Sequence, residues 1–269
     1  MRRALAPLRL GRPSSASVPL DELPRPAPRG HGAPRASVIV PTRGGPALAQ
    51  CLAAVRAYTR VPVELVVVDD ASGAVDLHAL PEGTRLVRLD ARRGFVGAAN
   101  AGARAAQTGL LVFLNDDVIV TPGWLEALEA ALASPRAALV APSSNDTGDA
   151  ATIGARYRGL AELLRFSAER RGPPVEVDKL SLACAAIRKG TFDGVGGLDE
   201  GYGLGLFEDD ELCRSLRARG GRILLVGDAY VHHHGSLTFD TLGSAARIAR
   251  FEINRHRFEQ RWRTRWRAP

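Results

Sequence analysis

Cysteine is scarce in this sequence, and its spacing does not indicate cross-links. The 269 residues include 3 cysteines, at Cys51, Cys184 and Cys213. Their number is odd and no two form a CxxC pair, so neither a disulfide framework nor a zinc knuckle is predicted. This cysteine usage fits a protein of the reducing cytoplasm.

Long apolar runs are also missing. No segment approaches the roughly 18 uninterrupted apolar residues that a membrane-spanning helix needs. The N-terminal stretch ALAPLRLG is interrupted by Pro7 and Arg9, which makes it too short for the core of a signal peptide. We therefore expect a cytoplasmic protein that neither spans a membrane nor is exported by that route.

Positive charge is concentrated at the two ends of the chain. Residues 1–35 hold seven arginines and two acids, and residues 247–269 hold eight arginines and two acids. These segments carry about +5 and about +6, so a total of +7 leaves about −4 for the residues between them. A nucleic-acid partner, which would need a basic face on the folded domain, is not expected.

The same composition suggests three parts. Residues 1–35 are rich in Pro and Arg without periodicity, which predicts a disordered basic arm. Residues 36–246 are predicted to form a single domain, and residues 247–269 a basic, aromatic C-terminal helix. In that helix Phe251, Phe258, Trp262 and Trp266 would share one face. Packing on the core is the preferred interpretation of this face, and contact with anionic lipid is the alternative.

Short apolar runs alternate with segments of helical periodicity in the first half of the domain. This alternation is typical of right-handed βαβ units and predicts an α/β fold with a mainly parallel open sheet flanked by helices. Thr121 and Pro122 are predicted to begin a helix, as N-cap and first helical residue. The second half is less regular. Strands are expected within 36–42, 63–73, 84–90, 110–117, 137–142, 180–190 and 222–235, and helices near 48–55, 94–107, 124–132 and 207–220.

Polar and acidic residues follow three of the predicted strands, at 42–43, 69–70 and 115–117. Ligands of open parallel sheets bind outside the carboxyl ends of the strands. An isolated acid at such a place more often caps the next helix. Acids on neighbouring strands, however, raise one another's pKa unless a cation lies between them. A hard divalent ion such as Mg²⁺ or Mn²⁺, completed by phosphate oxygens, is therefore predicted there.

Seven motifs in order and register carry a resemblance to a known family. They are SVIVPT, VVVDDAS, RRGFVGAANAG, LVFLNDDVIVTPGWLEAL, AAIRKGTFDGVGGLDEGY, FEDDELCRSLRARG and VHHHGS. From about Ser37 to about Trp262 the chain resembles the family two inverting glycosyltransferases, which have the GT-A fold. The resemblance implies transfer of a sugar from a nucleotide diphosphate sugar, with UDP or dTDP favoured. The acceptor would be a hydroxyl of a saccharide or lipid-linked saccharide, and peripheral contact with the inner face of the membrane would bring the enzyme to a lipid-linked one.

The resemblance also implies roles for thirteen residues. Residues 115–117 match the family's DxD position, with Asn115 replacing the first Asp. Eight residues would contact the nucleotide: Thr42, Arg43, Asp69, Asp70, Arg93, Gly94, Asn100 and Asp116. Asp117 and His233 would bind Mn²⁺ or Mg²⁺. Asp209 would be the catalytic base, with Glu208 and Asp210 on the acceptor side.

Two of these assignments leave alternatives open. Acids in the first turn of a helix favour its dipole, so the EDD run also fits a solvated helix start. The family usually has an Arg near Ser215 and an apolar residue in place of Asp210, so either Asp209 or Asp210 could face the acceptor. Alternation along a strand would direct His233 away from His232 and His234, although all three histidines could merely line a loop.

Two other function classes are weaker. A sugar nucleotidyltransferase needs a glycine-rich, basic loop after the first strand, and PTRGGPALAQ has only two glycines and one arginine. A non-catalytic module that only binds nucleotide sugars would not need the acids at positions 116, 117 and 209.

Overall fold

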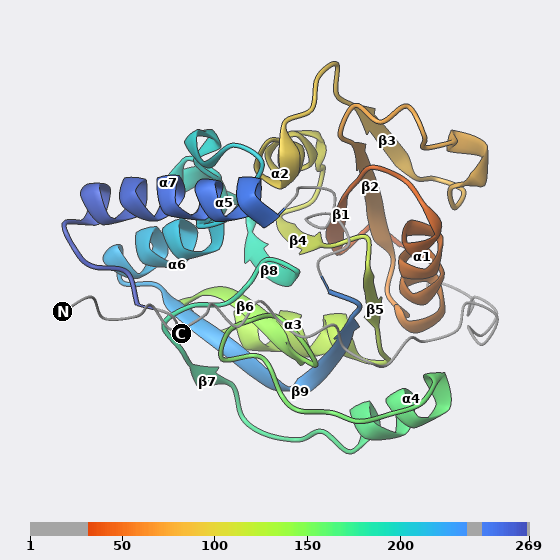
Figure 1. Cartoon of the computed structure of the whole chain (residues 1–269). Helices are drawn as coiled ribbons and strands as arrows, with labels where there is room; N and C mark the ends of the chain where they lie inside the picture. Colours follow the sequence, from red (N-terminus) through yellow and green to blue (C-terminus); the bar gives the residue numbers. More distant parts are fainter. Residues whose placement is uncertain (1–31, 236–243, 268–269) are drawn as a thin grey trace.

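A computed structural model describes residues 32–235 and 244–267, which contain one mixed sheet with helices on both faces (Figure 1). The predicted arm at 1–35 therefore lies almost entirely outside the described residues. The strands are β1 (Ala36–Thr42), β2 (Val63–Asp69), β3 (Arg85–Arg88), β4 (Leu110–Leu114), β5 (Val118–Val120), β6 (Ala137–Ser144), β7 (Val175–Glu176), β8 (Cys184–Arg188) and β9 (Arg222–His233). The helices are α1 (Pro46–Tyr58), α2 (Gly94–Ala105), α3 (Trp124–Leu132), α4 (Leu160–Ala168), α5 (Lys189–Val195), α6 (Glu208–Ala218) and α7 (Ser244–Trp262), with short 3₁₀ helices η2 (Leu77–Ala79) and η3 (Glu200–Tyr202).

The strand order confirms the expected α/β class. Over the described residues the sheet runs β3-β2-β1-β4-β8-β6-β9-β5, with β7 paired to β9. The first four strands in this order are parallel, as are β6 and β9, whereas β8 runs antiparallel to both of its neighbours. The carboxyl ends of β1, β2 and β4 therefore lie at one edge, together with the start of β8.

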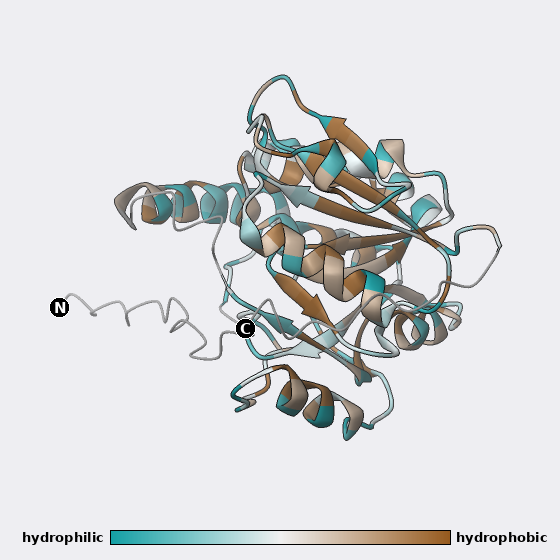
Figure 2. Cartoon of the chain, turned by 90° about the vertical axis from the view of Figure 1, so that its right-hand side faces the viewer, coloured by the Kyte–Doolittle hydropathy of each residue, from teal (hydrophilic) through white to brown (hydrophobic). Residues whose placement is uncertain are grey.

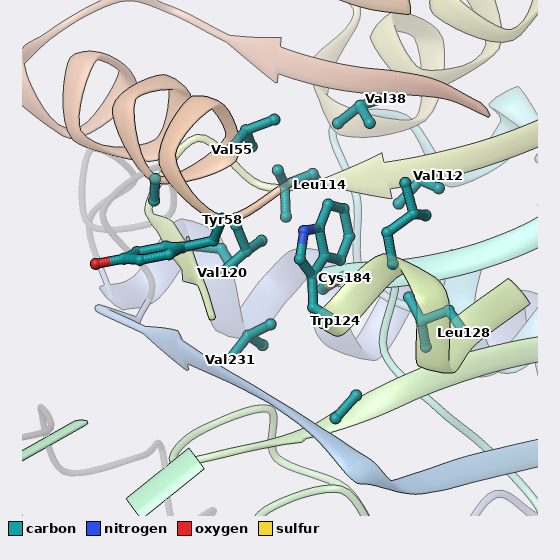
Figure 3. Close-up of a cluster of buried hydrophobic side chains, with 14 of the residues drawn as sticks. Val38, Val55, Tyr58, Val112, Leu114, Val120, Trp124, Leu128, Cys184 and Val231 are labelled. Carbon is teal, nitrogen blue, oxygen red and sulfur yellow. The ribbon is translucent and has the colours of Figure 1, made fainter. Parts of the chain in front are cut away.

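Alternating side chains of the central strands feed two separate cores. Val38 and Val40 of β1 pack with α1 and α3, whereas Ile39 packs with α2 on the opposite face. These strands are hydrophobic along most of their length because both faces are covered (Figure 2). In the first core the Trp124 ring lies among Leu114, Leu128 and Cys184 (Figure 3), and its indole N–H donates to Thr59 Oγ1 at 3.0 Å.

The structure corrects several sequence-based expectations of local structure. Thr121 does not cap a helix: α3 begins at Trp124 after Gly123, whose φ is 82°, and the Thr121 hydroxyl donates to the Tyr230 carbonyl at 2.6 Å. That partner is 109 residues away, so local capping chemistry could not anticipate it. β5, β7, α4, α5 and the two 3₁₀ helices were not predicted.

α7 lies beside α6 (Figure 1) and packs its aromatic face on the second core, as the preferred interpretation predicted. It ends at Trp262, earlier than expected, because Arg263 has a φ of 48° and the chain turns back. Arg257 and Arg261 both form ion pairs with Asp199, at 3.0 and 3.1 Å. Lipid contact by this helix stays a prediction. Within the described residues, we find no helix with the length and apolarity that crossing a bilayer requires.

Candidate active site

A cavity of about 280 Å³ lies at the carboxyl edge of β1, β2 and β4 and extends to α6 and α7. Ten of the thirteen residues named from the sequence line it: Thr42, Arg43, Asp70, Gly94, Asp116, Asp117, Glu208, Asp209, Asp210 and His233. The sequence-distant groups that were assigned to the nucleotide, the metal and the acceptor therefore face a single cavity.

Asp70 and Gly94 form one corner of this cavity. The two carboxylate oxygens of Asp70 accept hydrogen bonds from the backbone N–H groups of Arg93 and Gly94, at 2.6 and 2.9 Å. Gly94 has a φ of 66°, and a Cβ at this position would lie 2.2 Å from Leu204 Cα. Only glycine fits such a close approach, so this corner depends on the residue type as well as on the fold.

Three residues assigned to the nucleotide do not line the cavity. Asp69 is 1% exposed, and its carboxylate accepts hydrogen bonds from the Ser72 backbone N–H, the Ser72 hydroxyl and Arg88. Asn100 connects α2 to the chain at Leu198, donating to its carbonyl at 2.9 Å and accepting from its N–H at 3.0 Å. The Arg93 side chain lies 3.8 Å from Glu200. Asp69 and Asn100 hold neighbouring backbone, and Arg93 pairs with an acid, instead of lining the cavity.

Asp116 is a buried acid with a local donor. The Thr42 hydroxyl donates to its Oδ2 at 2.5 Å, which ties the end of β1 to the residues that follow β4. Burial raises the pKa of Asp116 to about 6, and the neighbouring charge of Asp117 adds to the shift. The carboxyl therefore loses its proton less readily than an exposed aspartate does.

Asp117 and His233 face each other across the cavity wall. His233 Nε2 and Asp117 Oδ1 are 3.1 Å apart, yet neither atom makes a hydrogen bond of acceptable geometry, and both are fully buried. The other ring nitrogen of His233 lies 2.6 Å from the Asp146 carbonyl, which can only accept, so Nδ1 carries a proton. Burial opposes ionisation of the His233 ring, but its contacts with Asp117 and the Asp146 carbonyl outweigh burial and raise its pKa. Burial opposes ionisation of Asp117, but the contact with His233 outweighs it and lowers the pKa of the acid.

The neighbouring histidines lie on the other side of the strand, as alternation predicted. His232 Nδ1 contacts the Tyr157 hydroxyl at 2.5 Å, and His234 Nε2 contacts Gln50 Oε1 at 3.0 Å. Burial lowers the pKa of His232 to about 3, which keeps this ring neutral. Only His233 of the three lines the cavity.

The first turn of α6 supplies three acids in different surroundings. Both oxygens of Asp210 are engaged, by Lys179 Nζ at 2.6 Å and by the indole N–H of Trp266 at 2.8 Å. Asp209 accepts one bond, from the Leu182 N–H at 3.2 Å, and among the described residues we find no partner for its second oxygen. Of these two acids, Asp209 is therefore the one with an oxygen available to a ligand.

Burial raises the pKa of two of these acids. Desolvation brings the pKa of Asp209 to about 7, against the opposing influence of the Lys179 ammonium. The pKa of Glu208 is raised for the same reason, and its Oε2 is buried without a hydrogen bond. A carboxyl that titrates near neutrality is suited to accept a proton during a reaction.

Sequence reasoning missed other residues that line the cavity, among them Arg92, Lys179 and Trp266. Lys179 is one of only two lysines in a chain whose other cations are arginines, which was a detectable signal. Arg92 is adjacent to the arginine that was chosen. Trp266 could not be placed, because its position depends on the turn at Arg263.

The residues present would hold a metal ion only with help from a ligand. The described residues contain no group of three or more His, Cys, Asp or Glu side chains arranged for an ion. Asp117 Oδ1 and His233 Nε2 are buried, face each other and make no hydrogen bond. Once an ion takes the place of a proton on Nε2, they offer two donors whose oxygen and imidazole chemistry suits Mn²⁺.

The sequence is similar to several proteins from bacteria. A pre-mycofactocin glycosyltransferase of Mycobacterium tuberculosis is 29% identical over 218 residues, covering 78% of this chain and 44% of that protein. An O-antigen biosynthesis protein of Myxococcus xanthus is 28% identical over 225 residues, covering 76% of this chain and 18% of that protein. The chain thus spans less than half the length of these relatives.

Solved structures agree on the fold. A mannosyltransferase of Pyrobaculum calidifontis in complex with GDP-Man and Mn²⁺ has a TM-score of 0.57 at 22% identity, over 93% of this chain and 69% of that one. GalNAc-T7 with UDP, GalNAc and Mn²⁺ has a TM-score of 0.59 at 20% identity, over 74% and 43%. The sheet therefore has the GT-A architecture that the resemblance implied. The family model "Glycosyl transferase family 2" matches residues 37–196, more than half of the sequence, and the chain belongs to that family.

Proposed function

We propose that the chain is a metal-dependent inverting glycosyltransferase, which transfers a sugar from a nucleotide diphosphate sugar to an acceptor hydroxyl. One observation carries the proposal. Asp117 and His233, whose facing atoms are buried without a hydrogen bond, line the same cavity as Asp209, whose second oxygen is available. Inversion requires a base on the face of the sugar opposite the departing diphosphate, and a single cavity with both groups can provide this.

Asp117 and His233 would hold Mn²⁺ or Mg²⁺. Because these side chains supply only two donor atoms, oxygens of the donor diphosphate and water would complete the coordination. The Mn²⁺ present with a nucleotide or nucleotide sugar in two similar structures supports this assignment. When bound, the ion would offset the charge that builds on the leaving diphosphate.

The donor nucleotide would lie against the ends of β1 and β2. Thr42, Arg43, Asp70 and Asp116 line that part of the cavity, and Arg92 adds a cation there. UDP or dTDP is the favoured nucleotide, because the resemblance implies it and one similar structure contains UDP. A GDP-Man complex among the similar structures makes GDP the natural comparison in an experiment.

Asp209 would act as the base. Its free oxygen takes the proton of the acceptor hydroxyl while the hydroxyl oxygen forms a bond to the anomeric carbon, and the bond from that carbon to the diphosphate breaks. The nucleoside diphosphate leaves with the electron pair. The first turn of α6 carries the acid, and the Leu182 N–H, from the segment before β8, donates to it and holds it in place. General-base catalysis of this kind contributes roughly 100- to 10,000-fold.

A two-stage experiment tests the proposal. Thermal-shift measurements with UDP, dTDP and GDP sugars, with and without Mn²⁺, should show stabilisation by one nucleotide class that depends on the metal. Nucleotide release from the stabilising donor should then be measured with glycosides of common sugars as acceptors. If no sugar nucleotide stabilises the protein and none is turned over, the proposal is wrong.

A further inference from the structure

The acceptor end of the cavity has an aromatic wall formed by Phe207, Phe251 and Trp266. The ring centroids of Phe207 and Phe251 lie 5.2 Å apart, and the Trp266 ring lies 5.2 Å from Phe207 and 5.4 Å from Phe251. All three residues line the cavity. We propose that this wall is a subsite that stacks against the sugar ring of a saccharide acceptor; the proposal rests on the glycosyltransferase function proposed above.

The wall lies directly beside the proposed base. The indole N–H of Trp266 donates to Asp210, which is adjacent to Asp209 in the chain and also binds Lys179. Phe207 immediately precedes the acids as the N-cap of α6. A sugar ring that rests on the wall would therefore have its hydroxyl groups within the same part of the cavity as the carboxylates.

The wall is held in place before any ligand arrives. The backbone N–H of Trp266 donates to Glu259 Oε1 at 2.9 Å, in addition to the indole bond to Asp210. The turn that brings Trp266 back over the cavity depends on the positive φ of Arg263. Two anchors on one residue leave the ring little freedom, so a ligand would pay little ordering entropy to bind it.

The surroundings of the wall favour a carbohydrate over an alkyl chain. A pyranose ring has C–H groups on its faces and hydroxyls at its edge, and the electron-rich faces of aromatic rings suit those C–H groups. The polar edge would meet Lys179, Asp209 and Asp210, which border the rings in the cavity. An alkyl chain in the same place would strip water from the Lys179–Asp210 pair without replacing its hydrogen bonds, which is unfavourable.

The wall also lies outside the part of the chain that the family model matches. That match ends at residue 196, whereas the three rings are contributed by residues 207, 251 and 266. Two of the three rings, Phe251 and Trp266, therefore come from α7 and the turn that follows it. The subsite would select the acceptor, whereas the donor nucleotide would lie against Thr42, Asp70 and Asp116 of the matched part.

The test measures how strongly acceptors accelerate nucleotide release. The whole 269-residue chain is assayed with Mn²⁺ and its stabilising sugar nucleotide, first without acceptor and then with a panel of methyl hexopyranosides and methyl rhamnosides. Trp266→Ala is expected to raise the acceptor KM by about 5- to 10-fold, and Phe251→Leu by about 3-fold, because leucine keeps the apolar volume but loses the flat ring. Trp266→Phe, which keeps a ring but loses the bond to Asp210, should fall between wild type and Trp266→Ala.

Trp262→Phe is the matched control. Its indole N–H also donates to an acid of α6, Glu211 at 2.7 Å, but Trp262 does not line the cavity. The acceptor KM of this variant should match that of the wild type. Thermal melting of each variant identifies those that lose the fold, and Phe251→Leu keeps the test valid if Trp266→Ala does.

The outcomes separate the two proposals. If glycosides accelerate release by the wild type and Trp266→Ala and Phe251→Leu leave the acceptor KM unchanged, the subsite is wrong and the proposed function stands. If the wild type releases nucleotide slowly and no glycoside accelerates it, a saccharide is not what the wall binds. If the wild type neither binds nor cleaves any sugar nucleotide, the proposed function fails, and the subsite fails with it.

Discussion

The two halves of the cavity are built in different ways. The donor half comes from the ends of β1, β2 and β4, where parallel pairing fixes the relative position of each polar residue. The acceptor half is assembled from residues 179–183, 207–210 and 247–266. Side-chain contacts between α7 and the region 199–211 hold these segments together. The donor half should therefore tolerate surface substitutions better than the acceptor half does.

The largest expected effect separates chemistry from donor binding. Asp209→Asn should lower turnover by roughly 100- to 10,000-fold, because an amide cannot accept the proton of the acceptor hydroxyl. Stabilisation by the donor nucleotide and Mn²⁺ should persist, as measured by thermal shift. Asp210→Asn is the matched variant. If Asp210→Asn loses this much turnover while Asp209→Asn stays active, Asp210 is the base instead.

The next effect concerns the metal. His233→Gln should weaken Mn²⁺ binding by at least about 10-fold, because the amide replaces an imidazole donor whose orientation the Asp146 carbonyl fixes. Isothermal titration with Mn²⁺ and the donor nucleotide measures this loss. His256→Gln, an exposed histidine on α7 that contacts Gln260, serves as the control. An unchanged Mn²⁺ affinity in His233→Gln would remove this residue from the ligand set.

A third prediction addresses the stability of the acceptor half alone. Asn254 Nδ2 donates to the carbonyls of Tyr202, Gly205 and Leu206, at 3.0, 2.9 and 2.9 Å. Asn254→Ala should lower the free energy of unfolding by about 1–3 kcal/mol, because buried carbonyls lose their donor. Hydrogen exchange should accelerate in residues 199–210 and stay unchanged in β1 and β4. Uniform acceleration over both halves would contradict the comparison.

The smallest effect is on pH dependence. The pKa of Asp209 is raised to about 7, so its base form is lost as the pH falls, and kcat/KM should rise with pH through the neutral range. The positive charge of the Lys179 ammonium lowers the pKa of Asp209 and so partly offsets the effect of burial. Lys179→Met should therefore shift the profile to higher pH, by about one unit. A profile that is identical in the wild type and Lys179→Met would mean that another group controls it.

The sequence predicted the strands of the donor half because local patterns determine them. Apolar runs identified β1, β2 and β4, and the acids that follow them end at the same edge because parallel strands share a direction. Predictions failed where distant partners decide the outcome. Asn100 lies in the expected helix, yet its side-chain amide donates to the carbonyl of Leu198, 98 residues away, instead of facing the cavity. Trp266 lies in the expected aromatic stripe, but the turn at Arg263 carries it to the cavity.

The antiparallel direction of β8 affects which amino-acid substitutions the site can tolerate during evolution. Because β8 enters the sheet at the edge where β4 leaves it, the main chain just before β8 reaches the site, with the Leu182 N–H donating to Asp209 and the Ala183 carbonyl accepting from the Asn115 N–H. A peptide group is present whatever side chain the codon specifies. Among single substitutions at position 182, only proline would delete that donor. Most substitutions at position 182 therefore leave the hydrogen bond that holds Asp209 in place, so the side chain at this position can vary.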